Sequence, residues 1–382
     1  METLGTETAF EVLAKAKALE KQGKDIVHLE IGEPDFDTPR NIKEAAAKAM
    51  NSGYTHYVPS AGLPELRQAI AEHISKTRNL DVTPEEVVVT PGGKPIMFFS
   101  ILALVNPGEE ILYPNPGFPV YESLINFVGA KPIPMPLKEE NDFSLDPEYV
   151  KEKITRKTKM IILNSPENPT GGVLSREDLK GIADSIAGRK DIFVLSDEIY
   201  SRIIFEGKHE SITQFSGMKD QTILLDGFSK TYAMTGWRLG YGVMHKDLAL
   251  KMAQLMTNSN SCTSAFTQMA GVEALRGSQT EIEKMIAEFR SRREVIVSGL
   301  NSIKGITCKK PRGAFYVFPN VTGTDMDSRT LGNYLLNTAG VAVLPGTSFG
   351  SYGEGYLRLS FANSVENIKK ALDRISKALK NR

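Results

Sequence analysis

Short apolar runs alternate with helical patterns through the middle of the 382-residue chain, and this alternation constrains the fold more than any other feature. Short strands that alternate with helices indicate a parallel sheet whose two faces are both covered. The sequence therefore predicts an α/β fold, with a large domain built on a mostly parallel sheet. The alternating segments are residues 111–113, 121–128, 131–135, 147–154, 160–163, 176–187 and 192–196.

Polar residues or glycines follow four of the predicted strands at the points where those strands end. In open parallel sheets a ligand binds in the crevice outside the carboxyl ends of the strands. We therefore expect the four sets of residues to meet in one crevice and to form a binding site. They are Gly92 and Gly93 after residues 87–90, Asn164 and Asn168 after 161–163, Asp197 and Tyr200 after 194–196, and Ser229 and Lys230 after 223–226.

Lys230 follows the apolar strand pattern that ends at Asp226, and its neighbours include Phe228, Tyr232 and Met234. Lysine prefers water, so a lysine in these surroundings suggests an amine that is wanted partly desolvated. An amine with a lowered pKa is a nucleophile toward carbonyl groups. The sequence therefore predicts a Schiff-base role for Lys230.

A glycine turn over residues 91–94 opens a predicted helix that runs to Val105. The free N–H groups and the positive dipole at such a helix N-terminus suit a phosphate. The turn departs from the P-loop pattern, which has a longer glycine spacing and a serine or threonine after the lysine, where this chain has Pro95. This departure argues against a nucleotide site.

An aromatic cofactor that carries a phosphate, a ring nitrogen and an aldehyde would fit these groups together. Arg238 and the N–H groups of Gly92 and Gly93 would hold the phosphate. Asp197 would supply a buried negative charge that keeps the ring nitrogen protonated. Lys230 would react with the aldehyde, and the protonated ring would act as an electron sink for a carbanion at the substrate α-carbon.

Three more residues are expected to contact the ring of this cofactor. Tyr200 and Asn168 would form hydrogen bonds with a ring hydroxyl. The side chain of Phe118, which lies in the proline-rich segment 114–119, would stack on the face of the ring.

A second, smaller α+β domain is predicted toward the C-terminus. One long helical pattern over residues 268–300 is followed by short strand patterns over 306–310, 313–318, 339–344 and 356–361. The last pattern carries Arg358 between apolar neighbours, which favours a partly buried guanidinium that meets a carboxylate bidentately. We expect residues 41–280 to form the large cofactor-binding domain, and residues 1–40 and 281–382 to form the small domain.

The N-terminal region is predicted to contain a helix over residues 8–22 and a short strand over 26–31. Thr38 is expected to cap the next helix, with Pro39 at its first position. Three acids, Glu33, Asp35 and Asp37, precede this helix, but no histidine or second carboxylate cluster accompanies them. We therefore expect no metal site.

Five motifs follow one another in an order and spacing that are far more specific than any one motif alone. They are Asn168-Pro169-Thr170-Gly171, Asp197-Glu198-Ile199-Tyr200, Ser229-Lys230 with Arg238 eight residues later, Pro311-Arg312-Gly313-Ala314-Phe315-Tyr316, and Arg358-Leu359-Ser360-Phe361. With these motifs the chain resembles the pyridoxal-phosphate-dependent aminotransferases of fold type I, classes I and II, over residues 32–358. The resemblance implies pyridoxal 5'-phosphate as cofactor, and an amino acid and a 2-oxo acid as substrates of a ping-pong reaction.

The resemblance also implies roles for individual residues. Lys230 would hold the cofactor and move a proton between the substrate α-carbon and the cofactor. Arg358 would grip the substrate α-carboxylate, Gly32 would lend that carboxylate a backbone contact, and Asn168 would also contact the substrate. The active protein would be a homodimer with shared sites, in which Tyr57 reaches the phosphate of the neighbouring subunit.

Gly227 departs from the family pattern, because many relatives carry a serine three residues before the lysine. Some phosphate contacts are then expected from Ser229, Lys94 or the backbone. Lys94 also resembles a lysine that some prokaryotic aspartate aminotransferases use to meet the distal carboxylate of a dicarboxylic substrate. We therefore expect aspartate or glutamate with 2-oxoglutarate, while alanine or aromatic donors, and a β-elimination lyase of the same fold, remain open.

A non-catalytic binding module is the third alternative, and the intact Lys230, Asp197 and Arg358 argue against it. Lysine and arginine total 46, as do aspartate and glutamate, so no basic surplus suggests nucleic acid or an anionic membrane. The longest apolar stretch, residues 96–105, is too short to span a bilayer. Two cysteines, Cys262 and Cys308, make neither a disulfide framework nor a metal site, and a cytoplasmic location without a signal peptide is expected.

Overall fold

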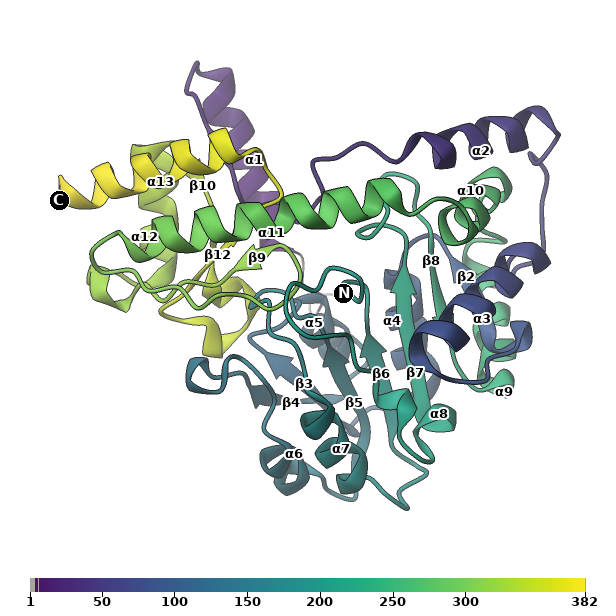
Figure 1. Cartoon of the computed structure of the whole chain (residues 1–382). Helices are drawn as coiled ribbons and strands as arrows, with labels where there is room; N and C mark the ends of the chain where they lie inside the picture. The colour runs from purple at the N-terminus through teal and green to yellow at the C-terminus, as the bar shows by residue number, and fades with distance from the viewer. Residues whose placement is uncertain (1–3, 6, 382) are drawn as a thin grey trace.

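A seven-stranded sheet forms the centre of the computed structural model, which describes residues 4, 5 and 7–381 (Figure 1). Its strands are β2 (Val87–Thr90), β3 (Glu110–Asn115), β4 (Lys131–Pro136), β5 (Thr158–Asn164), β6 (Phe193–Asp197), β7 (Thr222–Gly227) and β8 (Gly240–Val243). They lie in the order β2-β8-β7-β6-β5-β3-β4, and every neighbouring pair is parallel except the two that involve β8. The predicted mostly parallel sheet is confirmed.

Helices cover both faces of this sheet (Figure 1). They are α2 (Arg40–Asn51), α3 (Pro64–Arg78), α4 (Lys94–Leu104), α5 (Val120–Phe127), α6 (Pro147–Lys153), α7 (Arg176–Ser185), α8 (Met218–Gln221), α9 (Lys246–Ser259) and α10 (Ala265–Arg276). In β5, Met160 and Ile162 pack in one cluster with α4, α5 and α9, whereas Ile161 and Leu163 pack in another with α6 and α7. Because successive strand residues point to opposite faces, an apolar run of this kind needs helices on both.

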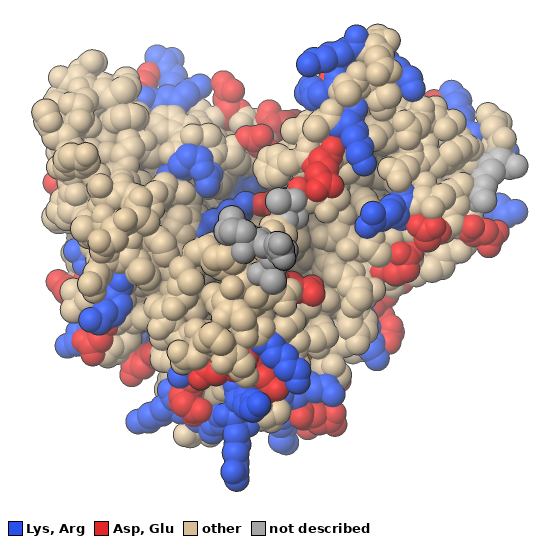
Figure 2. All heavy atoms as spheres, turned by 180° about the vertical axis from the view of Figure 1, so that it is seen from behind, with Lys and Arg blue, Asp and Glu red and all other residues tan. Residues whose placement is uncertain are grey.

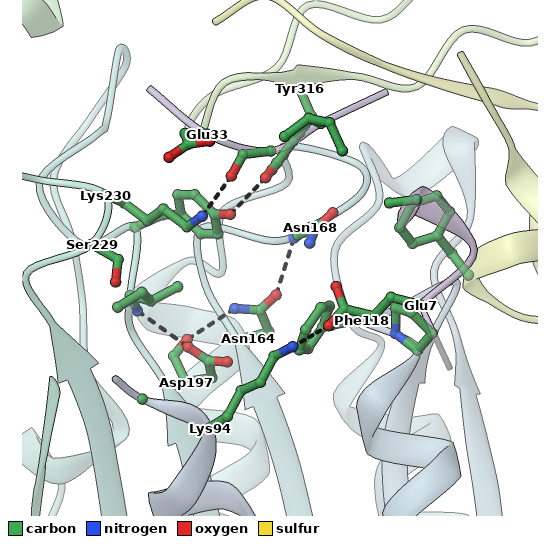
Figure 3. Close-up of a pocket in the computed structure, with 18 of the residues that line it drawn as sticks. Glu7, Glu33, Lys94, Phe118, Asn164, Asn168, Asp197, Ser229, Lys230 and Tyr316 are labelled. Atoms are coloured by element: carbon green, nitrogen blue, oxygen red, sulfur yellow. Dashed lines mark hydrogen bonds and ion pairs between the residues drawn. The ribbon is translucent and has the colours of Figure 1, made fainter. Parts of the chain in front are cut away.

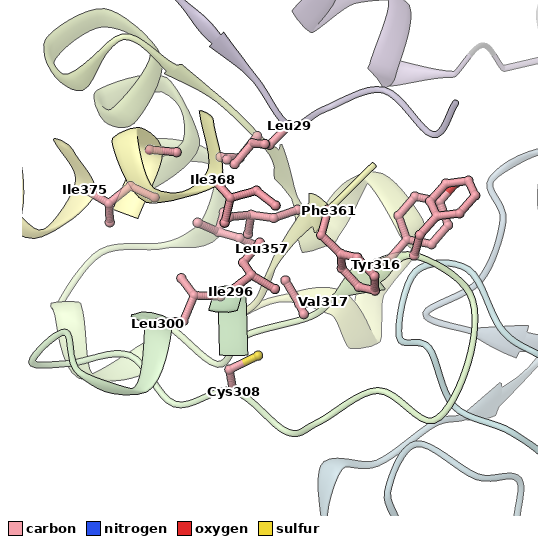
Figure 4. Packing of buried hydrophobic residues seen from close by; sticks show 14 of the residues in the cluster. Leu29, Ile296, Leu300, Cys308, Tyr316, Val317, Leu357, Phe361, Ile368 and Ile375 are labelled. Carbon is pink, nitrogen blue, oxygen red and sulfur yellow. The ribbon is translucent and has the colours of Figure 1, made fainter. Parts of the chain in front are cut away.

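A second layer of helices and short strands lies beside the large sheet (Figure 1). Its helices are α1 (Thr8–Lys21), α11 (Thr280–Asn301), α12 (Ser328–Tyr334) and α13 (Val365–Lys380). Its strands are β1 (Val27–His28), which pairs with β10 (Val341–Ala342), and β11 (Leu344–Pro345), β12 (Leu357–Ser360) and β9 (Tyr316–Val317), which pair in that order. The core of this layer buries Ile296 and Leu300 of α11 with Phe361 and with Ile368 of α13 (Figure 4).

The prediction of one long helix over residues 268–300 is wrong. α10 and α11 are separate helices, and Gly277 between them has an extended backbone. The side chain of Gln279 donates to the carbonyls of Ala274 and Gly277, which satisfies groups that the end of α10 leaves free. The apolar period continues across the break, so periodicity alone does not reveal it.

No helix within the described residues is long and apolar enough to cross a membrane.

Strands in the second layer are shorter than the sequence patterns predict. A single bridge between Thr307 and Asn320 replaces the predicted strand over 306–310, and the pattern over 313–318 pairs in the two residues of β9 and in one bridge between Gly313 and Ile204. β1 covers two residues of the predicted strand over 26–31, and the pattern over 339–344 belongs to two strands, β10 and β11. Ile306 and Cys308 are nevertheless buried in the cluster of α11 and α13. The apolar patterns here indicate burial, which an extended segment achieves without pairing.

Thr38 does not cap a helix, contrary to the prediction. α2 begins at Arg40, and its N-terminus has no hydrogen bond from a capping side chain. The Thr38 hydroxyl instead donates to the backbone carbonyl of Ala233 at 2.6 Å and accepts from the indole N–H of Trp237 at 2.9 Å. Thr38 therefore ties the start of α2 to the segment that follows Lys230, across 195 positions of the chain.

The strand patterns in the sequence do not reveal β8, because Gly240 and Gly242 lower its strand propensity. Close packing requires the first of these glycines. A Cβ on Gly240 would lie 2.5 Å from backbone atoms of Gly92 and Gly93, so only glycine lets β8 pass directly against the glycine turn. This approach brings Arg238, two residues before β8, next to that turn.

Candidate active site

A cavity of about 350 Å³ lies where the carboxyl ends of the sheet strands meet the second layer (Figure 3). Its volume is in the range of sites for small molecules. Residues from both layers line it, and most of the residues that the sequence singles out are among them. They are Gly32, Gly93, Lys94, Phe118, Asn164, Asn168, Asp197, Tyr200, Ser229, Lys230, Arg238 and Arg358.

Two of the predicted site residues do not line this cavity. Gly92 lies just outside it, where the side chain of Arg238 covers the glycine turn. Tyr57 lies elsewhere on the surface and is 86% exposed. Tyr57 therefore makes no contribution to the cavity of its own chain.

Lys230 follows β7, and its amine points into the cavity (Figure 3). Its Nζ donates a hydrogen bond of 2.5 Å to the backbone carbonyl of Gly32. Removal from water lowers the pKa of the amine to about 8; Glu33 acts in the opposite direction, and the charges of Arg358 and Arg238 add to the lowering. A lowered pKa leaves more of the amine neutral, and hence nucleophilic, near neutral pH.

Asp197 ends β6, and its buried carboxylate faces the cavity. The Tyr121 hydroxyl donates to Oδ2 at 2.8 Å, and the N–H of Ile199 donates to Oδ1 at 3.2 Å. Burial raises the pKa of Asp197 to about 6, although these two hydrogen bonds act to lower it. A cation beside a buried carboxylate favours the charged form. Asp197 is therefore suited to a partner such as a protonated ring nitrogen.

Arg238 and the glycine turn together make a cradle for an anion. Arg238 Nη1 donates to the carbonyl of Thr235 at 2.7 Å, and a Cβ on Gly92 would lie 2.2 Å from Nη2. Gly92 also has a φ of +87°, a conformation that favours glycine. The guanidinium thus lies against the turn that precedes α4. A cation next to a helix N-terminus suits a phosphate group.

Arg358 is a buried cation with unused hydrogen-bonding capacity. Its guanidinium is enclosed by the rings of Tyr316 and Phe349, whose centroids lie 4.5 and 4.9 Å from Cζ. Nη1 donates to Oδ1 of Asn168 at 3.1 Å, and Nη2 donates to the carbonyl of Glu30. Among the described residues, Nε of Arg358 has no hydrogen-bond partner. A carboxylate entering the cavity would satisfy it, because arginine binds carboxylates bidentately.

Tyr316 lines the cavity, although the sequence indicates it only as the last residue of a motif. The hydroxyls of Tyr200 and Tyr316 lie 2.8 Å apart and are hydrogen-bonded. A Cβ on Gly32 would lie 2.0 Å from the Tyr316 hydroxyl. Glycine at position 32 therefore lets the loop before α2 pass over Tyr316 and close this side of the cavity.

A buried charge network fixes the ends of β6 and β7 behind the cavity. Arg78 of α3 donates to Glu198 at 2.7 Å and to Asp226 at 3.3 Å, and His209 contacts Glu198 at 2.7 Å. Burial alone would raise the pKa of Glu198, but Arg78 and His209 outweigh burial and bring it to about 2. The network therefore anchors the residue that directly follows Asp197. Nothing in the sequence around Arg78 signals this role.

Lys94 and Glu7 form an ion pair on the wall of the cavity (Figure 3). Lys94 Nζ also lies 5.6 Å from the centre of the Phe118 ring. Glu7 is a cavity residue that the sequence does not reveal, because it stands 87 positions before its partner. Tyr121, the hydrogen-bond donor to Asp197, is another, and no local signal identifies it.

Comparison with known proteins identifies a consistent set of relatives. The model of the family described as aminotransferase class I and II matches residues 24–375. The aspartate aminotransferase of Pyrococcus horikoshii is 45% identical over 93% of this chain and 91% of its own length. Aromatic-amino-acid aminotransferase 2 of Thermococcus litoralis is 39% identical over 94% of this chain and 92% of its own length. The structure of Thermus thermophilus aspartate aminotransferase with maleate matches with a TM-score of 0.95 at 38% identity, over 99% of this chain and 98% of that one.

Proposed function

The chain belongs to the class I and II aminotransferases, and on that premise we propose that it moves the α-amino group between aspartate or glutamate and 2-oxoglutarate. One observation carries this proposal: the cavity holds a partly desolvated amine, Lys230, together with two cations that suit carboxylates, Arg358 and Lys94. A dicarboxylic amino acid has one carboxylate for each cation, and its amino group is the one to be transferred.

The residues of the cavity fit pyridoxal phosphate, the cofactor that this family implies. Arg238, the glycine turn and Ser229 would hold the phosphate. Gly92 leaves the space beside the Arg238 guanidinium open, because a side chain at position 92 would fill it. Asp197 would hold the ring nitrogen, since its buried carboxylate accepts hydrogen bonds from Tyr121 and Ile199 but forms no ion pair within the described residues. When bound, the cofactor withdraws electrons from the substrate α-carbon.

Three more residues would complete the cofactor site. The side chains of Tyr200 and Asn168 end at the same cavity and would reach a ring hydroxyl. Phe118 also lines the cavity, with its ring 5.7 Å from that of Tyr121, the residue that donates to Asp197. We propose that Phe118 covers one face of the cofactor ring, because offset aromatic contacts are favourable.

Lys230 and Arg358 would act on the substrate. Arg358 would bind the α-carboxylate through the edge of its guanidinium that carries Nε, which has no hydrogen-bond partner among the described residues. This contact would orient the α-carbon toward the Lys230 amine, which would move a proton between that carbon and the cofactor. A pKa of about 8 suits this task, since a base works best when its pKa lies near the working pH.

Replacement of Lys94 by alanine tests the acidic substrate. We expect kcat/KM for aspartate to fall about 10-fold, and kcat/KM for alanine to change by less than about 3-fold, because only aspartate has a second carboxylate for Lys94 to bind. Lys246→Ala is the matched control, since Lys246 is also the first residue of a helix but lies outside the cavity. Equal losses for aspartate and alanine in the Lys94 variant would remove the case for dicarboxylic donors.

The pH dependence of cofactor capture tests the lowered pKa of Lys230. We expect the rate at which cofactor-free protein takes up pyridoxal phosphate to rise from about pH 7, to be half-maximal at about pH 8 and to level off above about pH 9, because the neutral amine is the nucleophile. A lysine in water would continue to gain reactivity up to about pH 10. The rate is followed by the visible absorbance that attachment produces. A rise that continues to about pH 10 would contradict a desolvated amine.

Aromatic donors are the second candidate. Glu7 neutralises the charge of Lys94, and the Phe118 ring lies beside Lys94. The aromatic side chain of a substrate could therefore pack against this part of the cavity. Aromatic-amino-acid aminotransferase 2 of Thermococcus litoralis shows that the family includes proteins named for such donors. The kinetic comparison of wild type with the Lys94 variant distinguishes the two candidates when phenylalanine is included as a third donor, because an aromatic side chain has no carboxylate for Lys94 to bind.

We also propose how the chain divides into domains, that it forms a dimer, and that it is located in the cytoplasm. Residues 41–280 would form the cofactor-binding domain, and residues 1–40 with 281–382 the small domain, because the large sheet draws its strands from residues 87–243 alone. Two chains would form a dimer in which Tyr57 reaches the phosphate of the neighbouring chain, which its exposed ring permits. The free thiols of Cys262 and Cys308 suit the reducing cytoplasm.

A further inference from the structure

The carboxylate of Glu7 occupies the place where the proposed function puts the distal carboxylate of a substrate. Lys94 Nζ donates to Oε1 of Glu7, and both side chains line the cavity that contains Lys230 and Arg358 (Figure 3). The side chain of Lys94 is 51% exposed and that of Glu7 is 19% exposed. The acid is thus the more enclosed partner, as a group held in a ligand pocket would be.

The segment before α1 holds Glu7 in this position. The N–H of Gly5 donates to Oγ of Ser123 at 2.8 Å, and the same hydroxyl donates to the carbonyl of Gly5 at 3.2 Å. Leu4 packs against the apolar cluster of α4 and α5. On the other side, the carbonyl of Glu7 accepts from the N–H of Phe10 at 3.1 Å, in the first turn of α1. Contacts on both sides therefore fix the backbone that carries Glu7.

We infer that Glu7 is a specificity-determining residue that competes with the distal carboxylate of an acidic substrate for Lys94. This inference rests on the proposed function, which assigns that carboxylate to Lys94. Two carboxylates on one ammonium repel each other, so an acidic substrate has to displace Glu7. A substrate with a neutral side chain leaves the ion pair intact. Glu7 thereby lowers the preference of the site for dicarboxylic over monocarboxylic donors.

The Glu7→Gln variant tests the competition, because glutamine keeps the shape of the side chain and removes its charge. We expect the ratio of kcat/KM for aspartate to kcat/KM for alanine to rise about 3- to 5-fold, a size appropriate to a partly exposed ion pair. Succinate, which has two carboxylates and no amino group, serves as an equilibrium probe. Its dissociation constant from the holoenzyme, measured by calorimetry, should fall by a similar factor, independently of turnover.

Glu11→Gln is the matched control, since Glu11 is an exposed acid of α1 outside the cavity. It makes the same change in charge and should leave both the ratio and succinate binding within about 1.5-fold of wild type. An unchanged or weaker affinity for succinate in the Glu7→Gln variant would overturn the inference. That result would indicate that Glu7 only anchors the N-terminal segment, so that its replacement weakens the binding of all ligands equally.

Combination with Lys94→Ala separates this inference from the proposed function. We expect Glu7→Gln to lose its effect on succinate in the Lys94→Ala background, because Glu7 acts through Lys94. If the effect persists, Glu7 does not compete for Lys94 and the inference fails while the proposed function stands. If Lys94→Ala alone weakens aspartate and alanine equally, the acidic preference of the proposed function fails, and the competition fails with it.

Discussion

Replacing Lys230 with alanine is expected to lower kcat/KM for transamination by about 10³-fold or more, which corresponds to about 4 kcal/mol of transition-state stabilisation. The variant loses the amine that lies in the cavity beside Gly32. Without this amine the protein can neither attach the cofactor covalently nor remove the proton from the α-carbon. Steady-state rates with aspartate and 2-oxoglutarate measure the loss. The visible absorbance of the lysine-bound cofactor should also disappear from the purified protein.

Lys284→Ala provides the matched control for this variant. Lys284 pairs with Glu281 on the exposed face of α11, and it lies outside the cavity. Its removal should leave kcat/KM within about 2-fold of wild type, because surface substitutions have small effects. A Lys230→Ala variant that keeps more than about a tenth of wild-type kcat/KM, or keeps the absorbance, would show that another group carries the cofactor.

Replacing Arg78 with methionine is expected to lower the free energy of unfolding by about 3–5 kcal/mol, because its removal leaves the buried carboxylate of Asp226 without an ion pair among the described residues and that of Glu198 with His209 alone. The side chains of Arg78, Glu198 and Asp226 are 4%, 1% and 5% exposed, so water cannot replace the lost cation. Methionine fills similar space, which limits the loss from a cavity. Urea unfolding of the holoenzyme, followed by circular dichroism, measures the change.

The loss from Arg78→Met should be larger at about pH 8 than at about pH 6. Burial raises the pKa of Asp226 to about 7 even beside Arg78, and removal of Arg78 raises it further. An acid with a raised pKa in the folded state opposes folding increasingly as the pH rises toward that pKa. Lys76→Met, an exposed change on the same helix, should cost less than about 0.5 kcal/mol. A loss below about 1 kcal/mol for Arg78→Met would mean that Glu198 and Asp226 do not depend on it.

Much of the large sheet is predictable because its signals are local. The alternation of apolar runs and helical patterns between residues 111 and 196 indicates the parallel strands and the helices that cover them. Asp197 comes at the end of one of these runs, and Lys230 follows a further run over residues 223–226, which indicates where both side chains lie, since parallel strands end at one edge. Strand β8 escapes this reasoning, because the contact of Gly240 with the glycine turn decides its composition.

The second layer is less predictable because its apolar residues are buried without regular pairing. The segment around Ile306 and Cys308 has a strand-like pattern and forms one bridge. The break at Gly277 interrupts an apolar period that continues on both sides. In both cases the apolar pattern indicates that the residues are buried. Whether they form a helix, a strand or an irregular segment depends on neighbours that lie far away in the sequence.

The order of residues along the chain by itself determined the family, most of the large sheet and the identity of three chemical groups: an amine at Lys230, an acid at Asp197 and a guanidinium at Arg358. The tertiary structure alone decided which distant residues serve them. Tyr121 reaches Asp197 across 76 positions, Arg78 reaches Glu198 across 120, and Glu7 reaches Lys94 across 87. The reason is physical. Periodicity and strand ends are set by neighbours in the chain, whereas a hydrogen bond or ion pair depends on where the completed packing places both of its partners.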